Sequence, residues 1–280
     1  MPRCALLRPD IPERAVEPFR KVSPDLKAIA DLTGAADVSA ALIFGGDGTV
    51  HRHLSQLSLR KIPALIVPVG SGNDFAKALG IRNNGIALAA WQRFCATGKN
   101  VRTIDLGRIH SVGQEILFCC VAGMGLDADS NARANRMGPW LRSHGGYVIA
   151  AIQSIAAGRR AKIHMRSPLV ENRSRSWLLA VGNAHRYGGG ARIVPQANVD
   201  DGLLDVCFVR DMSKFKLLCV LPTVFWGGHL RLKEVSYYRV AVLEVDSDPE
   251  LQIYADGEPV CETPAKFSVL PQALKVIVPL

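Results

Sequence analysis

The sequence has no apolar run long enough to cross a membrane as a helix. Its longest run, 217–228, is far shorter than the roughly 20 residues that a bilayer requires. No basic and apolar leader opens the chain, so we do not expect secretion. Internal repeats and low-complexity segments are also missing. With 48% hydrophobic and 21% charged residues over 280 positions, the composition excludes disordered, collagen-like and coiled-coil chains, and it is typical of one large or two small globular domains.

Paired cysteine motifs are missing as well. The chain has seven cysteines, an odd number, and none of them forms a CxxC pair of the kind that zinc ribbons and redox motifs use. Most of them lie in apolar runs: Cys4, Cys95, Cys119, Cys120, Cys207, Cys219 and Cys261. We therefore expect reduced core thiols in a cytoplasmic protein.

Aromatic residues make up only 6% of the chain, and no basic stripe carries the interleaved aromatics that single-stranded nucleic acid needs for base stacking. Lysine and arginine number 34 against 25 acidic residues, which gives a net charge of +9. This excess favours anionic partners such as a nucleotide or a phospholipid surface. The one dense basic cluster, 159–162, is typical of a solvated helix end. We expect no nucleic-acid partner.

The first hundred residues alternate strand and helix patterns. Continuous apolar runs at 38–44 and 64–67 predict buried parallel strands. Helical patterns cover 50–59, 75–80 and 86–96. This alternation predicts an α/β domain with a parallel sheet and helices on both faces.

After residue 100 the pattern changes to short strands separated by polar, glycine or proline turns. Expected strands cover 101–109, 116–122, 177–181, 203–209, 240–245, 251–254, 267–270 and 275–278. Two helical patterns interrupt them, at 147–157 and 214–226. We therefore expect two domains, 1–100 and 101–280, joined at 98–100. The second is a β-rich, antiparallel, sandwich-like domain.

A glycine-rich turn joins the first predicted strand to the first predicted helix: Gly45, Gly46, Asp47, Gly48 and Thr49. Glycines permit close approach to a phosphate and positive φ, and a helix start presents free N–H groups to an anion. Thr49 adds a hydroxyl, and Asp47 adds a carboxylate that can organise Mg²⁺ or its waters. The alternative is a turn that needs glycine for tight packing alone.

A second loop, 68–76, follows the next strand and also leads into a helix. Ligands of open α/β sheets bind at the carboxyl ends of the strands, so two such loops on neighbouring strands predict a phosphate site. Asn73 and Asp74 are candidate ligand contacts. They can equally cap the following helix.

These two loops, GGDGT and PVGSGNDFAKALG, resemble the catalytic domain of the diacylglycerol kinase family, which includes sphingosine kinases and bacterial soluble lipid kinases. NAD kinases are more distant relatives that share GGDGT. The resemblance spans about residues 38 to 280. It continues through 104–107, 121–128, 189–195, 200–205 and 254–258.

The resemblance implies a nucleotide-binding α/β domain, a β-rich domain and an active site in the cleft between them. It implies ATP-dependent phosphorylation of a lipid hydroxyl. It assigns ATP contacts to five positions: Gly46, Asp47, Gly48, Thr49 and Ser71. At the position of Ser71 the family most often has threonine. Asp74 and Asp105 match carboxylates of a polar network that links metal and nucleotide.

For the second domain, the resemblance makes Glu258 the proton acceptor, with Asp256 beside it. It makes Asp201 the side-chain ligand of a structural magnesium, helped by the carbonyls of Asn198 and Leu203. A carboxylate can take a hydroxyl proton during phosphoryl transfer, which agrees with the role of Glu258. The alternative is that 256–258 and 200–202 are ordinary turns, because Asp-Gly is a strong turn signal.

The chain departs from the family pattern in two places. An Arg8-Pro9-Asp10 loop follows the first expected strand, 4–7, where the family has an Asn-Pro-type loop. His51-Arg52 replaces the usual Asn-Glu, and we expect His51 and His53 to face phosphate or solvent rather than a metal. These departures motivate one alternative, a nucleotide- or lipid-binding regulator without catalysis. A second alternative is an NAD-kinase-like enzyme.

The apolar segment 215–226, with Lys214, Lys216, His229 and Arg231 around it, can line an acyl-chain cleft, dip into a membrane interface or form a buried core helix. We expect a cytoplasmic lipid kinase peripheral to the membrane. It would use ATP and Mg²⁺ on diacylglycerol or a related lipid, and a homodimer is left open.

Overall fold

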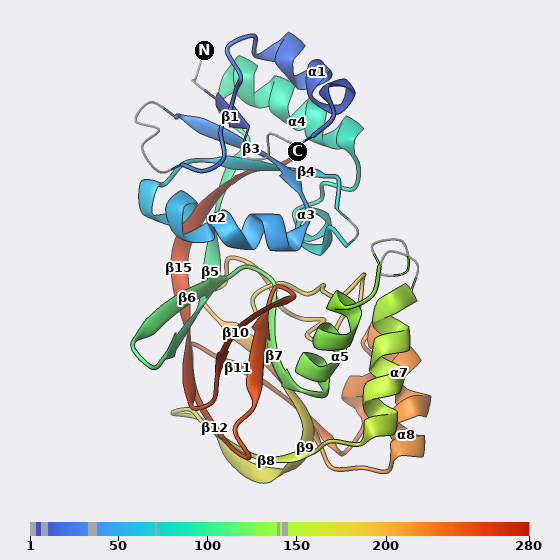
Figure 1. The fold of residues 1–280 in the computed structure, drawn as a ribbon. Coiled ribbons are helices and arrows are strands. Elements are labelled where there is room, and N and C mark those ends of the chain that lie inside the picture. The colour runs from blue at the N-terminus through green and yellow to red at the C-terminus, as the bar shows by residue number, and fades with distance from the viewer. Residues whose placement is uncertain are drawn as a thin grey trace. The chain divides into compact units, whose positions relative to one another are not determined.

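The structure is a computed structural model that describes residues 4–6 (backbone only), 11–32, 38–70, 72–138, 141 and 145–279. Figure 1 shows the chain as a ribbon. It divides into two compact units, Met1–Asp105 with Pro271–Leu280, and Leu106–Leu270. We predicted a single division near residue 100. The structure divides the chain at 105/106 and returns the last ten residues to the first unit, so strands β5 and β15 each carry residues of both units.

The first unit is built on a parallel sheet. Its elements are β1 (Cys4–Leu6), α1 (Glu13–Val22), β2 (Lys27–Ala28), β3 (Ala40–Gly45), α2 (Asp47–Arg60), β4 (Ala64–Pro68), α3 (Asp74–Ala78) and α4 (Asn84–Thr97). Strand β3 lies between β1 and β4, and β4 pairs in parallel with the end of β15 at Val276. Helix α2 lies on one face of this sheet, and α1 and α4 lie on the other (Figure 1).

Strands β3 and β4 and helices α2, α3 and α4 form close to where the sequence predicts them, whereas α1 and β2 were not predicted. Strand β3 is buried at every position, which is why its residues form one unbroken apolar run. Helix α4 begins where the Asn83 side chain accepts the Ile86 N–H. It ends at Gly98, which has a left-handed φ of 64° that glycine adopts easily because it has no Cβ. Helix α2 begins at Asp47, three residues before the predicted start. Asp47, Gly48 and Thr49 of the glycine-rich turn therefore form the first turn of the helix.

The second unit is an antiparallel β structure with helices. Its elements are β5 (Val101–Ser111), β6 (Gln114–Phe118), β7 (Val121–Gly125), α5 (Leu126–Asn135), α7 (Tyr147–Ala157), β8 (Ala161–Arg166), β9 (Glu171–Gly182), β10 (Leu204–Arg210), α8 (Lys214–Val220), the 3₁₀ helices η2 (Leu221–Trp226) and η3 (Gly228–Arg231), β11 (Val235–Val240), β12 (Val242–Asp248), β13 (Gln252–Ala255), β14 (Glu258–Glu262) and β15 (Ala265–Ile277).

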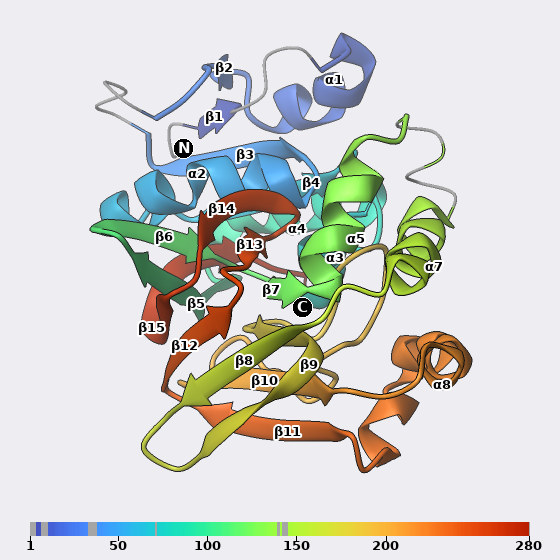
Figure 2. The same cartoon turned by 60° about the horizontal axis from the view of Figure 1, so that its bottom comes forward.

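Strands β7 to β13 pair antiparallel with their neighbours in this unit, and Figure 2 shows β8, β9, β10 and β11 in succession. Side chains from strands β5 to β15 form one apolar core that includes Phe118, Phe208 and Phe267. Helices α5, α7 and α8 pack one against the next beside it. Across the described residues, no helix is both long and apolar enough to span a bilayer.

Several predicted elements differ from the structure. The helix predicted at 214–226 stops at Val220 and continues as the 3₁₀ helix η2, because Pro222 has no N–H to donate to the helix. The strand predicted at 116–122 is two strands, β6 and β7, separated by a bend at 119–120. The strands predicted at 267–270 and 275–278 are one continuous strand, β15.

Candidate active site

The first glycine-rich loop connects β3 to α2. Glycine permits positive φ, but the two loops do not use it: φ is −110° at Gly46, and none of the glycines at 45, 46, 48, 70 and 72 has a positive φ. What glycine provides here is room. A Cβ at Gly45 would lie 2.5 Å from the side chain of Thr49, which folds back over it. Thr49 itself is half-buried in the first turn of α2.

The second loop lies directly on the first. A Cβ added at Gly70 would be 2.5 Å from the Cα of Gly46 and 2.8 Å from its nitrogen, so the two backbones touch. Asn73 holds this loop closed from a left-handed conformation with a φ of 55°. The Gly70 N–H donates to Asn73 Oδ1 at 2.9 Å, and the Asn73 amide donates to the Gly70 carbonyl at 2.7 Å.

Asp47 ties the two loops together. Its carboxylate accepts the backbone N–H groups of Asp74 at 3.1 Å and Phe75 at 2.9 Å, the first two residues of α3. We predicted that Asn73 or Asp74 could cap this helix. The structure shows no capping bond from the Asn73 side chain, and the capping carboxylate comes from the other loop. Because β3 and β4 are neighbouring parallel strands, the two loops form one backbone surface at their carboxyl ends.

The other residues predicted near the nucleotide differ in where they lie and how deeply they are buried. Ser71 and the 8–10 loop lie outside the described residues. Asp74 is fully buried, and buried Asp105 accepts the N–H of Gln272 at 2.8 Å. We expected His53 to face phosphate or solvent, and this is wrong: it is buried, and burial together with Arg52 lowers its pKa. His51 is half-buried in the same helix.

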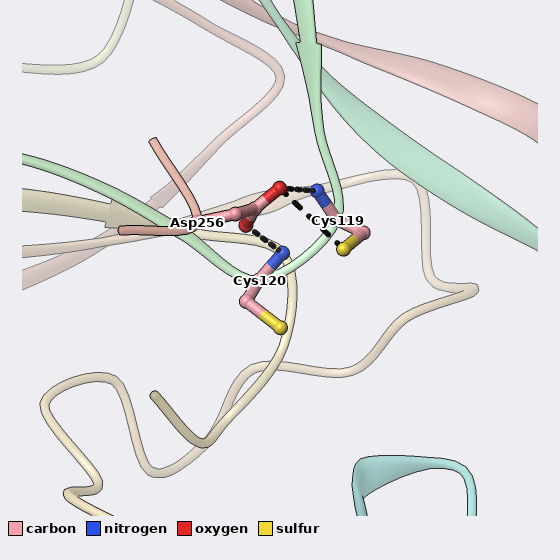
Figure 3. Close-up of side chains that lie close together, drawn as sticks. All are labelled: Cys119, Cys120 and Asp256. Carbon is pink, nitrogen blue, oxygen red and sulfur yellow. Dashed lines mark hydrogen bonds between the residues drawn. The ribbon is translucent and has the colours of Figure 1, made fainter. Parts of the chain in front are cut away.

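In the second unit, Asp256 and Gly257 form a two-residue hairpin turn between β13 and β14, with φ values of 51° and 89°. The turn interpretation is therefore correct for the local backbone. The Asp256 side chain does more than shape this turn. Its two carboxylate oxygens accept the backbone N–H groups of Cys119 at 2.9 Å and Cys120 at 2.7 Å (Figure 3). Glu258, the next residue but one, is half-buried at the start of β14.

Helix α5 links this turn to a second polar group. Near its C-terminal end, the Asn135 amide donates to the Gly257 carbonyl at 2.8 Å. In its first turn, Asp127 lies over Gly123, where a Cβ would be 1.8 Å from a carboxylate oxygen. Asp127 accepts hydrogen bonds from the Tyr187 hydroxyl and from the Asn131 amide. Burial raises the pKa of Asp127 to about 6, against the opposing effect of the Tyr187 hydrogen bond.

An apolar cavity of about 110 Å³ lies between α5, α7, α8 and η2. Its apolar lining includes Val148, Ala151, Leu217, Val220, Leu221, Val224 and Phe225. Its polar lining includes Asp127, Tyr187 and His229. Burial lowers the pKa of His229, whose Nε2 lies 3.0 Å from the Ile193 carbonyl oxygen. This volume holds several waters or a stretch of alkyl chain.

Sequence reasoning gave no role to Asp127 or Tyr187 and named His229 only as a flanking residue. The motif at 121–128 contains Asp127, which was the available signal. The sequence offered no sign that Tyr187 and His229 line the same cavity as Asp127, because these residues are far apart along the chain.

Asp201 lies in the turn before β10. Its Oδ1 accepts the Leu203 N–H at 3.1 Å, and its Oδ2 accepts a hydrogen bond from the Arg239 guanidinium. Beneath it, buried Asp205 accepts the Tyr237 hydroxyl at 2.7 Å, and burial raises the pKa of Asp205. Asp205 Oδ2 has no hydrogen-bond partner among the described residues. The two carboxylates therefore face one guanidinium, that of Arg239.

Two family models match the chain. The diacylglycerol kinase catalytic domain matches residues 15–109, and the YegS C-terminal NAD kinase beta sandwich-like domain matches residues 120–278. A diacylglycerol kinase of Mycobacterium tuberculosis is 38% identical over 242 residues, which cover 86% of this chain and 77% of that protein. A Pseudomonas aeruginosa protein named "Probable lipid kinase YegS-like" is 31% identical, over 84% of this chain and 75% of its own length.

Solved structures share the fold. A diacylglycerol kinase from Bacillus anthracis has a TM-score of 0.72 at 18% identity, over 98% of this chain and 96% of its own. An NAD kinase from Archaeoglobus fulgidus in complex with ATP has a TM-score of 0.57 at 12% identity, over 99% and 92%. The predicted fold class is confirmed, with a parallel α/β unit followed by an antiparallel, sandwich-like one. The family resemblance of the motifs is confirmed too, and the chain belongs to the diacylglycerol kinase family of lipid kinases, with the C-terminal domain of its YegS-like members.

Proposed function

We propose that the protein transfers the γ-phosphate of ATP to a hydroxyl of diacylglycerol or a related lipid. The observation that carries this choice of acceptor is the apolar cavity beside Asp127. A lipid needs an apolar site for its chain and a polar group near its hydroxyl, and the cavity offers both. A soluble dinucleotide needs no such lining, which is why we favour a lipid over NAD.

For the nucleotide, we propose the surface made by the two loops of the first unit. Helix α2 begins at Asp47, and the positive end of its dipole favours an anion there. Gly46 and Gly48 leave room for a phosphate, while the hydroxyls of Thr49 and Ser71 would add hydrogen bonds. Asp47 holds the second loop against the first through α3, so it shapes this surface whichever other contacts it makes.

For the chemical step, we propose Glu258 as the proton acceptor. The acceptor oxygen would form its bond to the γ-phosphorus while the bond from that phosphorus to the ADP oxygen breaks, and the hydroxyl proton would pass to Glu258. Asp256 and the Asp256–Gly257 turn would hold Glu258 in place. The N–H groups of Cys119 and Cys120 fix this turn from one side, and Asn135 fixes it from the other.

Mg²⁺ bound with ATP would neutralise the charge that develops on the transferred phosphoryl group. We propose that a second, structural Mg²⁺ is held by Asp201 and the carbonyls of Asn198 and Leu203. Arg239 competes for the same carboxylate. The ion should therefore bind more tightly when Arg239 is removed.

For the lipid source, we propose a membrane surface facing the cytoplasm. Phe215 and Trp226 on α8 and η2 are 78% and 66% exposed, and Lys214 is exposed beside Phe215. Exposed aromatic and basic side chains of this kind favour the membrane interface. Phe225 lines the cavity and is itself 41% exposed, so the apolar lining continues to this surface. A lipid chain could pass from the bilayer along it.

The test is a radiolabelled ATP assay against a lipid panel in mixed micelles, with NAD included as an acceptor. We expect label in a lipid alcohol and none in NAD. Ala151→Phe fills the cavity, and Ala157→Phe places the same ring on the exposed end of the same helix as a control. The first should raise the lipid KM at least tenfold with unchanged ATP binding, and the second should not. Label in NAD alone, or equal effects of the two variants, would refute the lipid site.

A further inference from the structure

We propose that Cys119, Cys120 and Asp256 bind zinc or another thiophilic divalent ion, and that this ion inhibits the kinase. Binding itself depends only on these three side chains. The inhibition rests on the proposed function, because Asp256 shapes the turn that carries Glu258.

The three residues come together from two segments of the chain, the bend between β6 and β7 and the hairpin turn between β13 and β14 (Figure 3). Their ligand atoms all lie within 4.8 Å of one another. The backbone N–H groups of Cys119 and Cys120 hold the Asp256 carboxylate, so the segments are fixed before any ion arrives. Among the described residues, no other group of three histidine, cysteine or acidic side chains has this spacing.

The distances suit tetrahedral zinc. With Zn–S of about 2.3 Å and Zn–O of about 2.0 Å, tetrahedral geometry separates sulfur from oxygen by about 3.5 Å and two sulfurs by about 3.8 Å. Cys119 Sγ lies 3.5 Å from Asp256 Oδ2. Cys120 Sγ lies within 4.8 Å of the other two ligand atoms but points away from the carboxylate (Figure 3), so its side chain would have to rotate toward Asp256 to bind the same ion. A water would take the fourth position.

The donor set selects the ion. Two thiolates and one carboxylate favour zinc or cadmium, whereas Mg²⁺ prefers an all-oxygen site. Binding converts two thiols to thiolates and releases two protons to solvent for each ion bound, with no change of oxidation state. All three residues are buried, so the ion would dissociate slowly and stay bound when the protein is diluted. The site thus discriminates against the magnesium that the reaction uses.

Binding is tested with cadmium and zinc salts alone, on full-length protein kept reduced and freed of metal by a chelator. We expect one ion per chain and an ultraviolet thiolate-to-cadmium absorption band. Cys119→Ala and Cys120→Ala should each lose the band and weaken zinc binding at least tenfold. Cys219→Ala is the control, because Cys219 is an exposed lone thiol. A band that persists in both buried-cysteine variants, or that disappears in Cys219→Ala, would overturn the site.

A second measurement needs no variant and so does not depend on how the variants fold. Because both thiols are buried in the folded protein, their alkylation is followed in mild urea, where it reports transient exposure. Bound cadmium should slow the alkylation of Cys119 and Cys120 in the wild type, measured by peptide mass spectrometry, and leave that of Cys219 unchanged. Alkylation rates of Cys119 and Cys120 that do not change with cadmium would overturn the site. Inhibition is read as the ratio of kinase activity with zinc to activity without it. This ratio should fall in wild type, recover on adding chelator, and stay near one in Cys119→Ala. Protection without inhibition would overturn the regulatory role alone, and protection in a protein that labels no lipid would refute only the proposed function.

Discussion

Replacing Gly70 by alanine should disable the nucleotide surface, because this position is where the two loops touch. The added methyl carbon would lie 2.5 Å from Gly46 Cα, 2.8 Å from Gly46 N and 2.9 Å from Asn73 Oδ1. Non-bonded carbon atoms pack at about 3.5–4.0 Å, so the loops must separate by about 1 Å. Two of the three atoms belong to backbone and cannot rotate away.

The cost follows from that separation. Overpacking of this kind destabilises by about 1–3 kcal/mol. For a chain of this size each kcal/mol lowers Tm by about 2–4 °C, which gives a fall of about 2–12 °C. The variant should lose more in ATP binding than in stability. A displacement of about 1 Å at a site that positions a substrate typically reduces function about 100-fold. Moving the loops apart also strains the two hydrogen bonds from α3 to Asp47.

The measurements are calorimetric titration with Mg-ATP and a melting curve on the same preparation. Gly138→Ala is the control, since a Cβ there meets no atom of the described residues within 4 Å. Gly72→Ala is intermediate, because its Cβ would meet its nearest atom, an Asp47 carboxylate oxygen, at 3.2 Å rather than 2.5 Å, and it should cost less than Gly70→Ala. A folded Gly70→Ala protein with unchanged Tm and ATP affinity would show that the loops do not act as one surface.

Three further predictions concern the other carboxylates. Glu258→Gln should lower kcat by about 10²–10⁴ with nearly constant ATP affinity, as expected for loss of a general base, and a rate within about threefold of wild type would exclude that role. Added Mg²⁺ without ATP should raise the Tm of wild type, raise it further in Arg239→Gln and leave Asp201→Ala unchanged; equal responses in all three would mean that 200–202 is only a turn. Asp127 binds its proton more tightly in the fold, with a pKa raised from 3.8 to about 6, so its contribution to the free energy of unfolding is present below pH 4 and is lost as the pH rises through about 6. As the pH rises from 4 to above 6, Asp127→Asn should therefore gain on the order of 3 kcal/mol in free energy of unfolding relative to wild type, measured by urea unfolding. A difference in free energy of unfolding that does not change with pH would refute the raised pKa.

The sequence predicted those elements whose signals are local. The helix at 147–157 has the predicted bounds because its apolar periodicity and the glycine after it are contained in the segment itself. Strand β3 was recognisable because every residue in it is buried. In contrast, the break at Val220 was missed even though Pro222 was visible, because the apolar pattern continues through it.

The site was predictable only as separate motifs. Apolar periodicity shows that a residue is buried, but it does not identify the residue that it packs against. The bonds from α3 to Asp47 cross about 27 residues, and the bond from Cys119 to Asp256 spans 137. The cavity likewise collects Asp127, Tyr187 and His229 from three segments. Such contacts depend on how the sheet is ordered, and the sequence pattern does not specify that order.

These long-range contacts determine which substitutions can separate chemistry from structure. Asp47 and Asp256 each accept two backbone N–H groups from another segment, so asparagine at either position would place an amide N–H₂ against one of those donors. An unsatisfied buried donor costs about 1–3 kcal/mol, and the loop or turn would shift to relieve it. Loss of activity in Asp47→Asn or Asp256→Asn would therefore fit a displaced backbone as well as a missing catalytic charge. Glu258 begins a strand that the turn before it already fixes, so Glu258→Gln leaves that support in place. Of the three carboxylates, Glu258 is the one whose substitution reports on proton transfer itself.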